Sequence, residues 1–117
     1  MTTLKRGFVI DVNLDPTQGS ETGKIRPCVI VTNNIYNERV PVIQVVPITA
    51  WNEKKSWIKT NIEVLPNYKN GLSKQSIVDC LQTRPIDHRF RLVNIRGELT
   101  AEEMGKIDEA LKVVFAL

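Results

Sequence analysis

The chain has 117 residues, of which 42% are hydrophobic and 25% charged, and we therefore expect one folded domain over residues 1–117. No run approaches the roughly 18 apolar residues of a membrane span, and the N-terminus lacks the apolar region of a signal peptide, so we expect a cytoplasmic protein without membrane contact. The net charge of +3 divides into +6 over residues 1–97 and −3 over residues 98–117, which fits a polyanion-binding face and equally a solvated surface of mixed charge.

The first half of the chain has the pattern of β-strands. Over residues 8–14, hydrophobic side chains alternate onto one face of a strand, namely those of Phe8, Ile10, Val12 and Leu14. Residues 15–24 are polar and contain two glycines, which predicts a long loop. The apolar run over residues 28–32 is typical of a strand buried on both faces. A loop over residues 33–39 and a strand over 42–49 follow, and Pro47 indicates that this strand ends or reaches an edge there.

The middle of the chain is less regular. Residues 51–59 are rich in Lys and Trp and predict an exposed connection, whereas residues 60–64 alternate as a strand does. The Asn70-Gly71 pair favours a turn, and residues 76–81 predict a further strand. A brief alternation over residues 89–93 predicts the last strand.

The C-terminal segment is helical. Thr100 followed by Glu103 forms a capping box, in which the two side chains satisfy free amide groups at the start of a helix. Hydrophobic residues then recur at helical spacing and predict a core-facing stripe made of Met104, Ile107, Leu111, Val114 and Phe115. About five short antiparallel strands followed by one helix predict an α+β domain, mainly antiparallel β, arranged as a small barrel.

Cysteine and histidine offer little catalytic chemistry. Cys28 and Cys80 lie far apart in apolar runs, as reduced core cysteines do. His88 is the only histidine, it stands in a polar stretch typical of a surface, and no Cys-x-x-Cys pair occurs, so we expect no metal site. Gly23-Lys24-Ile25 breaks the phosphate-binding loop pattern and no dinucleotide fingerprint occurs, so we also expect no cofactor.

Arg26 is the first candidate for chemistry. Pro27 favours an extended conformation for Arg26 at the start of a buried strand, where a guanidinium could bind a phosphate. A solvent-facing arginine is the alternative. Thr49 ends a strand and could offer its hydroxyl to the same phosphate, or serve only as a β-former. Trp51 and Trp57, among lysines, could stack on bases or pack against the core or a second subunit.

Several segments taken together resemble the MazF/PemK family of toxin endoribonucleases. The resemblance begins with Lys5-Arg6-Gly7, the loop motif Asp15-Pro16-Thr17-Gln18-Gly19-Ser20-Glu21 and Lys24-Ile25-Arg26-Pro27. It continues with Val46-Pro47-Ile48-Thr49, with residues 71–87 and with the terminal helix over residues 100–117. The loop motif and Arg-Pro at this spacing are specific, and the resemblance covers nearly the whole chain.

The resemblance implies a CcdB/MazF-like fold, which is an SH3-like antiparallel barrel with a C-terminal helix, assembled as a homodimer. It further implies a growth-inhibiting toxin of a toxin–antitoxin system that cleaves single-stranded RNA at short sequences without a metal. An acidic cognate antitoxin would inhibit it. The family's catalytic residues fall on Arg26 and Thr49, with Glu21 at an acidic loop position linked to catalysis or substrate contact.

We expect the substrate to contact the loop motif, the lysine-rich connection and the segment after the 76–81 strand. The candidate substrate-binding residues are Thr17, Gln18, Gly19, Ser20, Lys54 and Gln82. An RNA 2′-OH can attack the adjacent phosphodiester without a metal if its proton is accepted and the developing charge is stabilised, which gives a 2′,3′-cyclic phosphate and a 5′-OH. Arg26 would stabilise the charge, and either Glu21 or Arg26 would accept the proton.

Two other functions fit the same scaffold. A CcdB-like toxin that binds a protein target such as gyrase needs no Arg26–Thr49 pair and would depend on its C-terminal tail. A catalytically inactive RNA-binding module would keep the basic surface alone. Cleavage of RNA in the presence of EDTA separates the ribonuclease from both.

Overall fold

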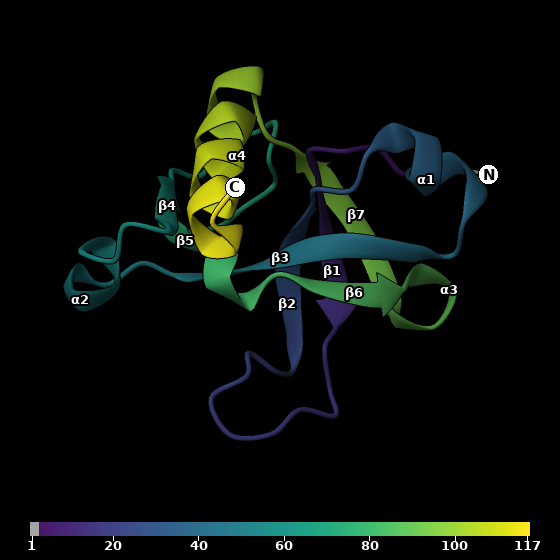
Figure 1. Cartoon of the computed structure of the whole chain (residues 1–117), viewed down its shortest axis with the longest axis horizontal. Helices are drawn as coiled ribbons and strands as arrows, with labels where there is room; N and C mark the ends of the chain where they lie inside the picture. Colours follow the sequence, from purple (N-terminus) through teal and green to yellow (C-terminus); the bar gives the residue numbers. More distant parts are fainter. Residues whose placement is uncertain (1–2) are drawn as a thin grey trace.

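The computed structural model describes residues 3–117, which form seven strands and a long C-terminal helix (Figure 1). The strands are β1 (Phe8–Asn13), β2 (Ile25–Ile30), β3 (Val42–Ala50), β4 (Asn61–Val64), β5 (Ser76–Asp79), β6 (Arg84–Asp87) and β7 (Leu92–Glu98). The helices are α1 (Asn34–Arg39), α2 (Glu53–Ser56), α3 (His88–Arg91) and α4 (Ala101–Phe115), and Cys80–Gln82 form a 3-10 turn, η1. No helix in this range is long and apolar enough to cross a membrane.

All strand pairs are antiparallel, in the order β4-β5-β3-β2-β1-β7, with β6 beside β3. Strand β3 changes its partner along its length, because Val42–Val45 pair with β6 and Ile48–Ala50 pair with β5. Pro47 lies inside β3 at this change of partner, where one side of the strand is unpaired and a residue without an N–H is tolerated. The expected mainly antiparallel α+β fold is confirmed, but within the described residues β7 pairs only with β1 and β4 only with β5, so the barrel is not closed.

The sheet buries a hydrophobic core on each of its faces. Val9 and Val29 pack with Met104 and Ile107 of α4, whereas alternate residues of the same strands pack on the opposite face. The opposite core contains Ile10, Val12, Leu14, Cys28, Ile30, Ile43, Val45 and Ile86, with Phe8 packed against it. The predicted alternation over residues 8–14 and the strand buried on both faces are therefore confirmed.

Helix α4 begins at the predicted capping box. The Thr100 hydroxyl accepts a hydrogen bond from the Glu103 amide at 3.1 Å, and the Glu103 carboxylate accepts one from the Thr100 amide at 2.9 Å. Met104, Ile107 and Ala110 are buried against the sheet. The prediction is wrong for Phe115, which is 56% exposed because it lies in the last turn, beside the C-cap residue Ala116.

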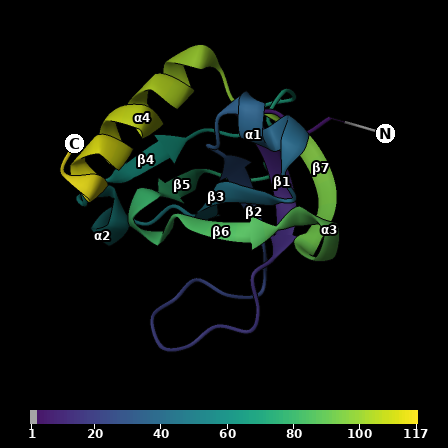
Figure 2. The same cartoon turned by 45° about the vertical axis from the view of Figure 1, so that its right-hand side comes forward.

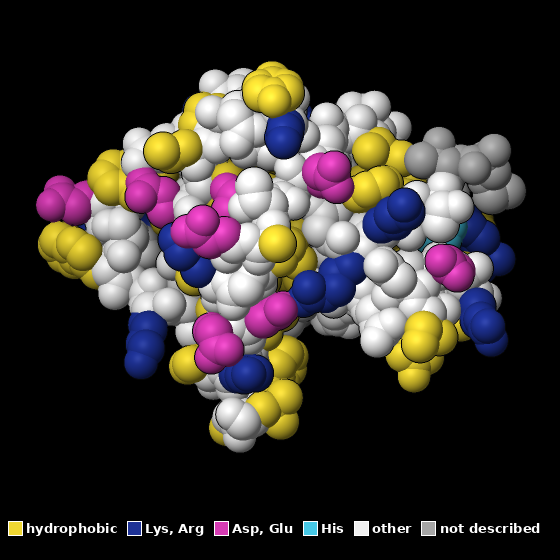
Figure 3. Space-filling view, turned by 90° about the horizontal axis from the view of Figure 1, so that it is seen from above, with side chains coloured by type: hydrophobic (Ala, Val, Ile, Leu, Met, Phe, Trp, Pro, Cys, Tyr) yellow, Lys and Arg dark blue, Asp and Glu magenta, His cyan; other side chains and the backbone are white. Residues whose placement is uncertain are grey.

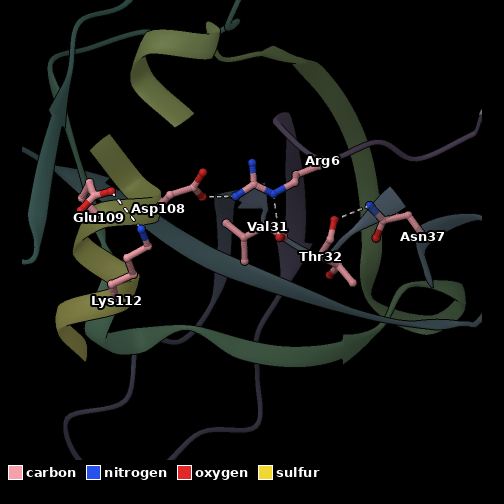
Figure 4. Close-up of polar contacts among 7 residues, drawn as sticks. All are labelled: Arg6, Val31, Thr32, Asn37, Asp108, Glu109 and Lys112. Atoms are coloured by element: carbon pink, nitrogen blue, oxygen red, sulfur yellow. Dashed lines mark hydrogen bonds and ion pairs between the residues drawn. The ribbon is translucent and has the colours of Figure 1, made fainter. Parts of the chain in front are cut away.

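Arg6 ties α4 to the N-terminal segment and to the end of β2. Its Nε donates to the Val31 carbonyl at 3.0 Å, and its guanidinium forms an ion pair with Asp108 of α4 (Figure 4). The Arg6 amide donates to the Asn34 side chain at 2.7 Å. This one residue therefore connects three elements that are distant in the sequence.

Several short elements differ from the sequence predictions. The expected connection over residues 51–59 contains α2, and the predicted strand over residues 76–81 ends at Asp79, where η1 begins. The predicted loop over residues 33–39 contains α1, which the Asn33 side chain caps by accepting a hydrogen bond from the Ile35 amide. The predicted strand over residues 89–93 is wrong, because α3 occupies residues 88–91 and β7 starts at Leu92. Strand β6 was not predicted, because Pro85 lies within it and only its pairing with β3 makes it a strand.

The segment between β1 and β2 projects from the body of the molecule. In both views this loop extends away from the strands on the side opposite α4 (Figures 1 and 2). The predicted long loop over residues 15–24 is confirmed. The turn at Asn70-Gly71 is also confirmed, and it requires a glycine, since Gly71 has a φ of +68° and a Cβ there would lie 2.6 Å from the Arg96 carbonyl oxygen.

Candidate functional site

Arg26 and Thr49 lie just beyond the paired part of β2 and β3. The pairing of the two strands ends at Cys28 and Pro47, and each of the two residues is two positions further along its strand. Both residues line the same hollow, which has a volume of about 190 Å³. Two residues separated by 23 positions in the sequence therefore meet at one site.

The hollow is cationic and rich in hydroxyl groups. Its polar lining consists of Arg26, Thr49, Ser73, Lys74, Ser76 and Arg96, and no carboxylate of the described residues lines it. Arg96 is engaged elsewhere, since its Nε donates to the Asp11 carboxylate at 2.7 Å and its Nη1 to the Gly71 carbonyl at 2.8 Å. Arg26 and Lys74 form no ion pair within residues 3–117. Their charges are therefore available to an anion such as a phosphate.

The guanidinium of Arg26 is held at one edge only. Its Nε donates to the Gly23 carbonyl at 3.3 Å, and the side chain is half-buried. In the described part of the chain its two terminal nitrogens make no hydrogen bond. A guanidinium anchored in this way keeps two parallel donors for the oxygens of a phosphate.

The hydroxyl of Thr49 contacts a lysine of α2. The Lys55 Nζ donates to the Thr49 Oγ1 at 3.4 Å. Lys55 is half-buried, whereas its neighbour Lys54 is exposed. Trp57, at the end of α2, is 74% exposed and thus free to contact a ligand, whereas Trp51 is half-buried.

The projecting loop is ordered by its own side chains. The Asp15 carboxylate accepts hydrogen bonds from the Thr17 hydroxyl at 3.2 Å and the Lys24 amide at 2.9 Å. The Glu21 carboxylate accepts one from the Gln18 amide at 2.7 Å. Gly19 has a φ of +55°, a conformation that favours glycine. Ser20 is exposed between these contacts.

Gln82 fastens this loop to η1. Its side-chain oxygen accepts from the Thr22 amide and its side-chain nitrogen donates to the Ser20 carbonyl, both at 3.2 Å. Glu21 and Gln82 line a second hollow of about 390 Å³, which neither Arg26 nor Thr49 lines. The structure therefore brings Arg26 and Thr49 together, brings Glu21 and Gln82 together, and separates the two pairs.

The two cysteines are unsuited to nucleophilic chemistry. Both are free and buried, and burial raises the pKa of each thiol to about 12. Both thiols are therefore protonated at neutral pH, which agrees with the predicted reduced core cysteines. Residues 3–117 contain no group of three or more His, Cys, Asp or Glu side chains that could hold a metal ion.

Comparison with known proteins identifies the family. The family described as "PemK-like, MazF-like toxin of type II toxin-antitoxin system" matches residues 5–115. The chain belongs to this family. Endoribonuclease EndoA of Bacillus subtilis (strain 168) is 36% identical to it over 114 residues, which cover 97% of this chain and 96% of that protein.

Solved structures support the PemK/MazF assignment at the level of the fold. MazF from Deinococcus radiodurans superposes with a TM-score of 0.84 over 100% of both chains, at 21% identity. A mycobacterial endoribonuclease in complex with its cognate antitoxin superposes with a TM-score of 0.75 at 22% identity, over 96% of this chain and 94% of that chain. The protein is thus a PemK/MazF endoribonuclease toxin, as its sequence motifs predicted.

The sequence placed Lys55 in a lysine-rich connection without assigning it a contact, and it did not single out Lys74 or Arg96 as part of the site. Lys55 lies next to the predicted Lys54, and only the orientation of α2 shows which of the two reaches Thr49. Lys74 and Arg96 come from the segment after the Asn70-Gly71 turn and from β7, and the fold brings both to the hollow. The nearest sequence signal was the turn itself, since it predicted that the chain reverses just before Lys74.

Proposed function

We propose that the hollow of Arg26 and Thr49 cleaves single-stranded RNA at short specific sequences in the cytoplasm, without a metal ion. The RNA supplies its own nucleophile: the 2′-oxygen passes its proton to a water molecule and bonds to phosphorus, the bond from phosphorus to O5′ breaks, and O5′ takes up a proton from water. The products are a 2′,3′-cyclic phosphate and a 5′-OH. DNA lacks the 2′-OH and is not cut.

The observation that carries this proposal is the meeting of Arg26 and Thr49 in one cationic hollow. The free edge of the Arg26 guanidinium stabilises the charge that develops on the phosphorane, and the Thr49 hydroxyl donates a hydrogen bond to a non-bridging oxygen. Lys74 adds a positive charge beside them. Preorganised donors of this kind each contribute about 10²–10³-fold in rate.

We assign the remaining predicted residues to holding the RNA on either side of the cut. The loop residues Gln18, Gly19 and Ser20 are exposed, Thr17 beside them is half-buried, and Gln82 fixes the position of the loop. Lys54 is an exposed residue of α2 and contacts a neighbouring phosphate. Glu21 lines a different hollow from Arg26 and orders the loop through Gln18, so we place it in substrate contact rather than at the reacting phosphate.

Purified protein is incubated with a mixed-sequence single-stranded RNA in EDTA, beside the variants Arg26→Ala and Thr49→Ala. We expect the wild type to cut and each variant to lose at least 100-fold in rate, with ends that carry a cyclic phosphate and a 5′-OH. A 2′-deoxy substitution at the mapped cut should abolish cleavage. Undiminished cleavage by both variants would contradict the site, and intact RNA with the wild type would contradict the function.

We also propose that a cognate antitoxin inhibits this toxin by placing an acidic segment on the basic hollow. The mycobacterial endoribonuclease with its cognate antitoxin supports a partner of this type, and the uncompensated charges of Arg26 and Lys74 favour an acidic one. Binding should weaken as salt is raised. A complex in which the antitoxin contacts only helix α4 would contradict this proposal.

We further propose that residues 1–117 form one toxin domain that assembles as a homodimer. Exposed hydrophobic side chains support a subunit contact, among them Ile35, Tyr36, Val40 and Val42 around α1 and the start of β3. Sedimentation equilibrium should give twice the mass of 13.3 kDa. A monomer at micromolar concentration would contradict the dimer and leave the single domain intact.

A further inference from the structure

We propose that Lys55 is a positioning residue that orients the hydroxyl of Thr49 toward the phosphate. The proposal rests on the RNA cleavage proposed above and adds to it a residue outside the lining of the hollow. Its basis is the hydrogen bond from the Lys55 Nζ to the Thr49 Oγ1, at 3.4 Å, which joins α2 to the end of β3.

The effect follows from the hydrogen-bonding capacity of the two groups. An ammonium group is a donor only, whereas a threonine hydroxyl has one proton and two lone pairs. When Lys55 donates to Thr49, the hydroxyl accepts on one lone pair and its proton turns to another acceptor. The non-bridging oxygen of a phosphate in the hollow is such an acceptor. Lys55 therefore makes Thr49 a donor at the reacting phosphate, and its charge strengthens that donor.

The local fold holds Lys55 in this place. The Asn52 side chain, which caps α2, accepts from the Lys55 amide at 2.7 Å, and the Lys55 carbonyl accepts from the Asn61 side chain at 3.0 Å. Both backbone groups of Lys55 are thereby fixed, and its side chain extends to β3. The side chain of Lys54 is exposed and makes no hydrogen bond with any residue in the described range.

The first test separates kcat from KM. Rates are measured on a short RNA oligonucleotide that spans one mapped cut. Lys55→Met keeps the unbranched stem and removes the ammonium, and we expect kcat to fall about tenfold while KM stays within twofold. Lys55→Arg restores a donor and should recover most of the lost kcat. Lys54→Met, one position away, should raise KM instead. Lys106→Met on the solvent side of α4 controls for net charge and should leave both constants unchanged.

The second test is a double-mutant cycle with Thr49→Val. If Lys55 acts through the Thr49 hydroxyl, Lys55→Met costs nothing further in the Thr49→Val background. If the kcat reductions of the two single variants multiply in the double variant, the proposal is overturned and Lys55 is assigned to direct substrate contact. Equal kcat for wild type and Lys55→Met would also overturn it, while RNA cleavage by the wild type leaves the proposed function standing. A wild type that cuts no RNA would overturn both.

Thermal unfolding of each variant shows whether a lost activity reflects lost folding. Lys55→Met removes no backbone hydrogen bond of α2, because these bonds use the amide and carbonyl groups. We expect its midpoint to stay close to that of the wild type. If Lys55→Met unfolds early, Lys55→Leu serves in its place because leucine also lacks a donor, and a kcat of Lys55→Leu equal to that of the wild type would overturn the proposal.

Discussion

Arg26 and Cys28 lie two residues apart on the same face of β2, yet their surroundings differ. Cys28 is in the core with Ile30 and Val45, whereas Arg26 lies at the open end of the strand beside Thr49. Because burial disfavours a charged group, the thiol is held in its protonated form. The guanidinium of Arg26 is only half-buried, and its terminal nitrogens make no hydrogen bond within the described residues. Position along one strand thus separates a structural residue from a functional one.

The thiols predict how stability depends on alkaline pH. Folding raises the pKa of Cys28 and Cys80 from 9.0 to about 12, so above pH 9 the unfolded chain releases thiol protons that the folded chain retains. The contribution of the two thiols to the free energy of unfolding should therefore be complete below pH 9 and decrease between pH 9 and pH 12. At pH 10 we expect a loss of about 1 kcal/mol per thiol. Urea titrations at several pH values measure it. Cys28→Val should flatten the slope, and an unchanged slope in that variant would contradict the assignment.

The elements around the site are fixed by contacts with distant parts of the chain. Arg84 of β6 donates to the Leu14 carbonyl at 3.0 Å, and Arg91 of α3 donates to the carbonyls of Asn13 and Asp15 at 2.9 and 2.7 Å. Both arginines hold the base of the projecting loop. The base of the loop is therefore held by β6 and α3, two elements that were not predicted at these residues, while Gln82 of η1 holds the part around Ser20 and Thr22.

Two substitutions at helix α4 should change the stability of the protein in opposite directions. Thr100→Ala removes the hydroxyl of the capping box and should lower the free energy of unfolding by about 1 kcal/mol.

Gly105→Ala adds a methyl group into open space within the same helix and should raise the free energy of unfolding by about 0.5–1 kcal/mol. Both are measured by denaturant titration. A destabilised Gly105→Ala variant would show that this position is covered by a partner or a second subunit.

Charge is arranged differently on different parts of the molecule. On the face seen from the top of Figure 1, acidic and basic side chains are interspersed with hydrophobic ones (Figure 3). The hollow at Arg26, by contrast, is lined by cations without a carboxylate among the described residues. The net charge of +3 is therefore a poor guide to the site, and the local arrangement of charge decides where a polyanion binds.

This arrangement predicts the salt dependence of RNA binding. Each cation that neutralises a phosphate of a single strand contributes about 0.7 to the slope of log K against log salt. Lys74→Ala should weaken binding of an uncleavable 2′-deoxy-substituted oligonucleotide and reduce that slope by about 0.7, whereas Lys106→Ala on α4 should leave the slope unchanged. Fluorescence anisotropy at several salt concentrations measures both. An equal reduction by both variants would mean that the overall charge, not the hollow, attracts the RNA.

The sequence by itself determined the features that depend on neighbouring residues. The capping box at Thr100, the alternation over residues 8–14 and the turn at Gly71 each arise from hydrogen bonds, periodicity or backbone freedom within a few residues. The motifs around Arg26 and Thr49 also identified the family. Because these features depend on short segments, they can be predicted without knowledge of the rest of the chain.

The tertiary structure alone decided which residues meet. Strand β6 with Pro85 exists because β3 pairs with it, whereas α3 begins at a local cap, in which the Asp87 side chain accepts a hydrogen bond from the Arg89 amide at 3.1 Å. The pairing of β2 with β3 brings Arg26 and Thr49 to one hollow, and the orientation of α2 places Lys55 rather than Lys54 at the Thr49 hydroxyl. A shift of one residue in any register would exchange these partners, because successive side chains of a strand point to opposite faces.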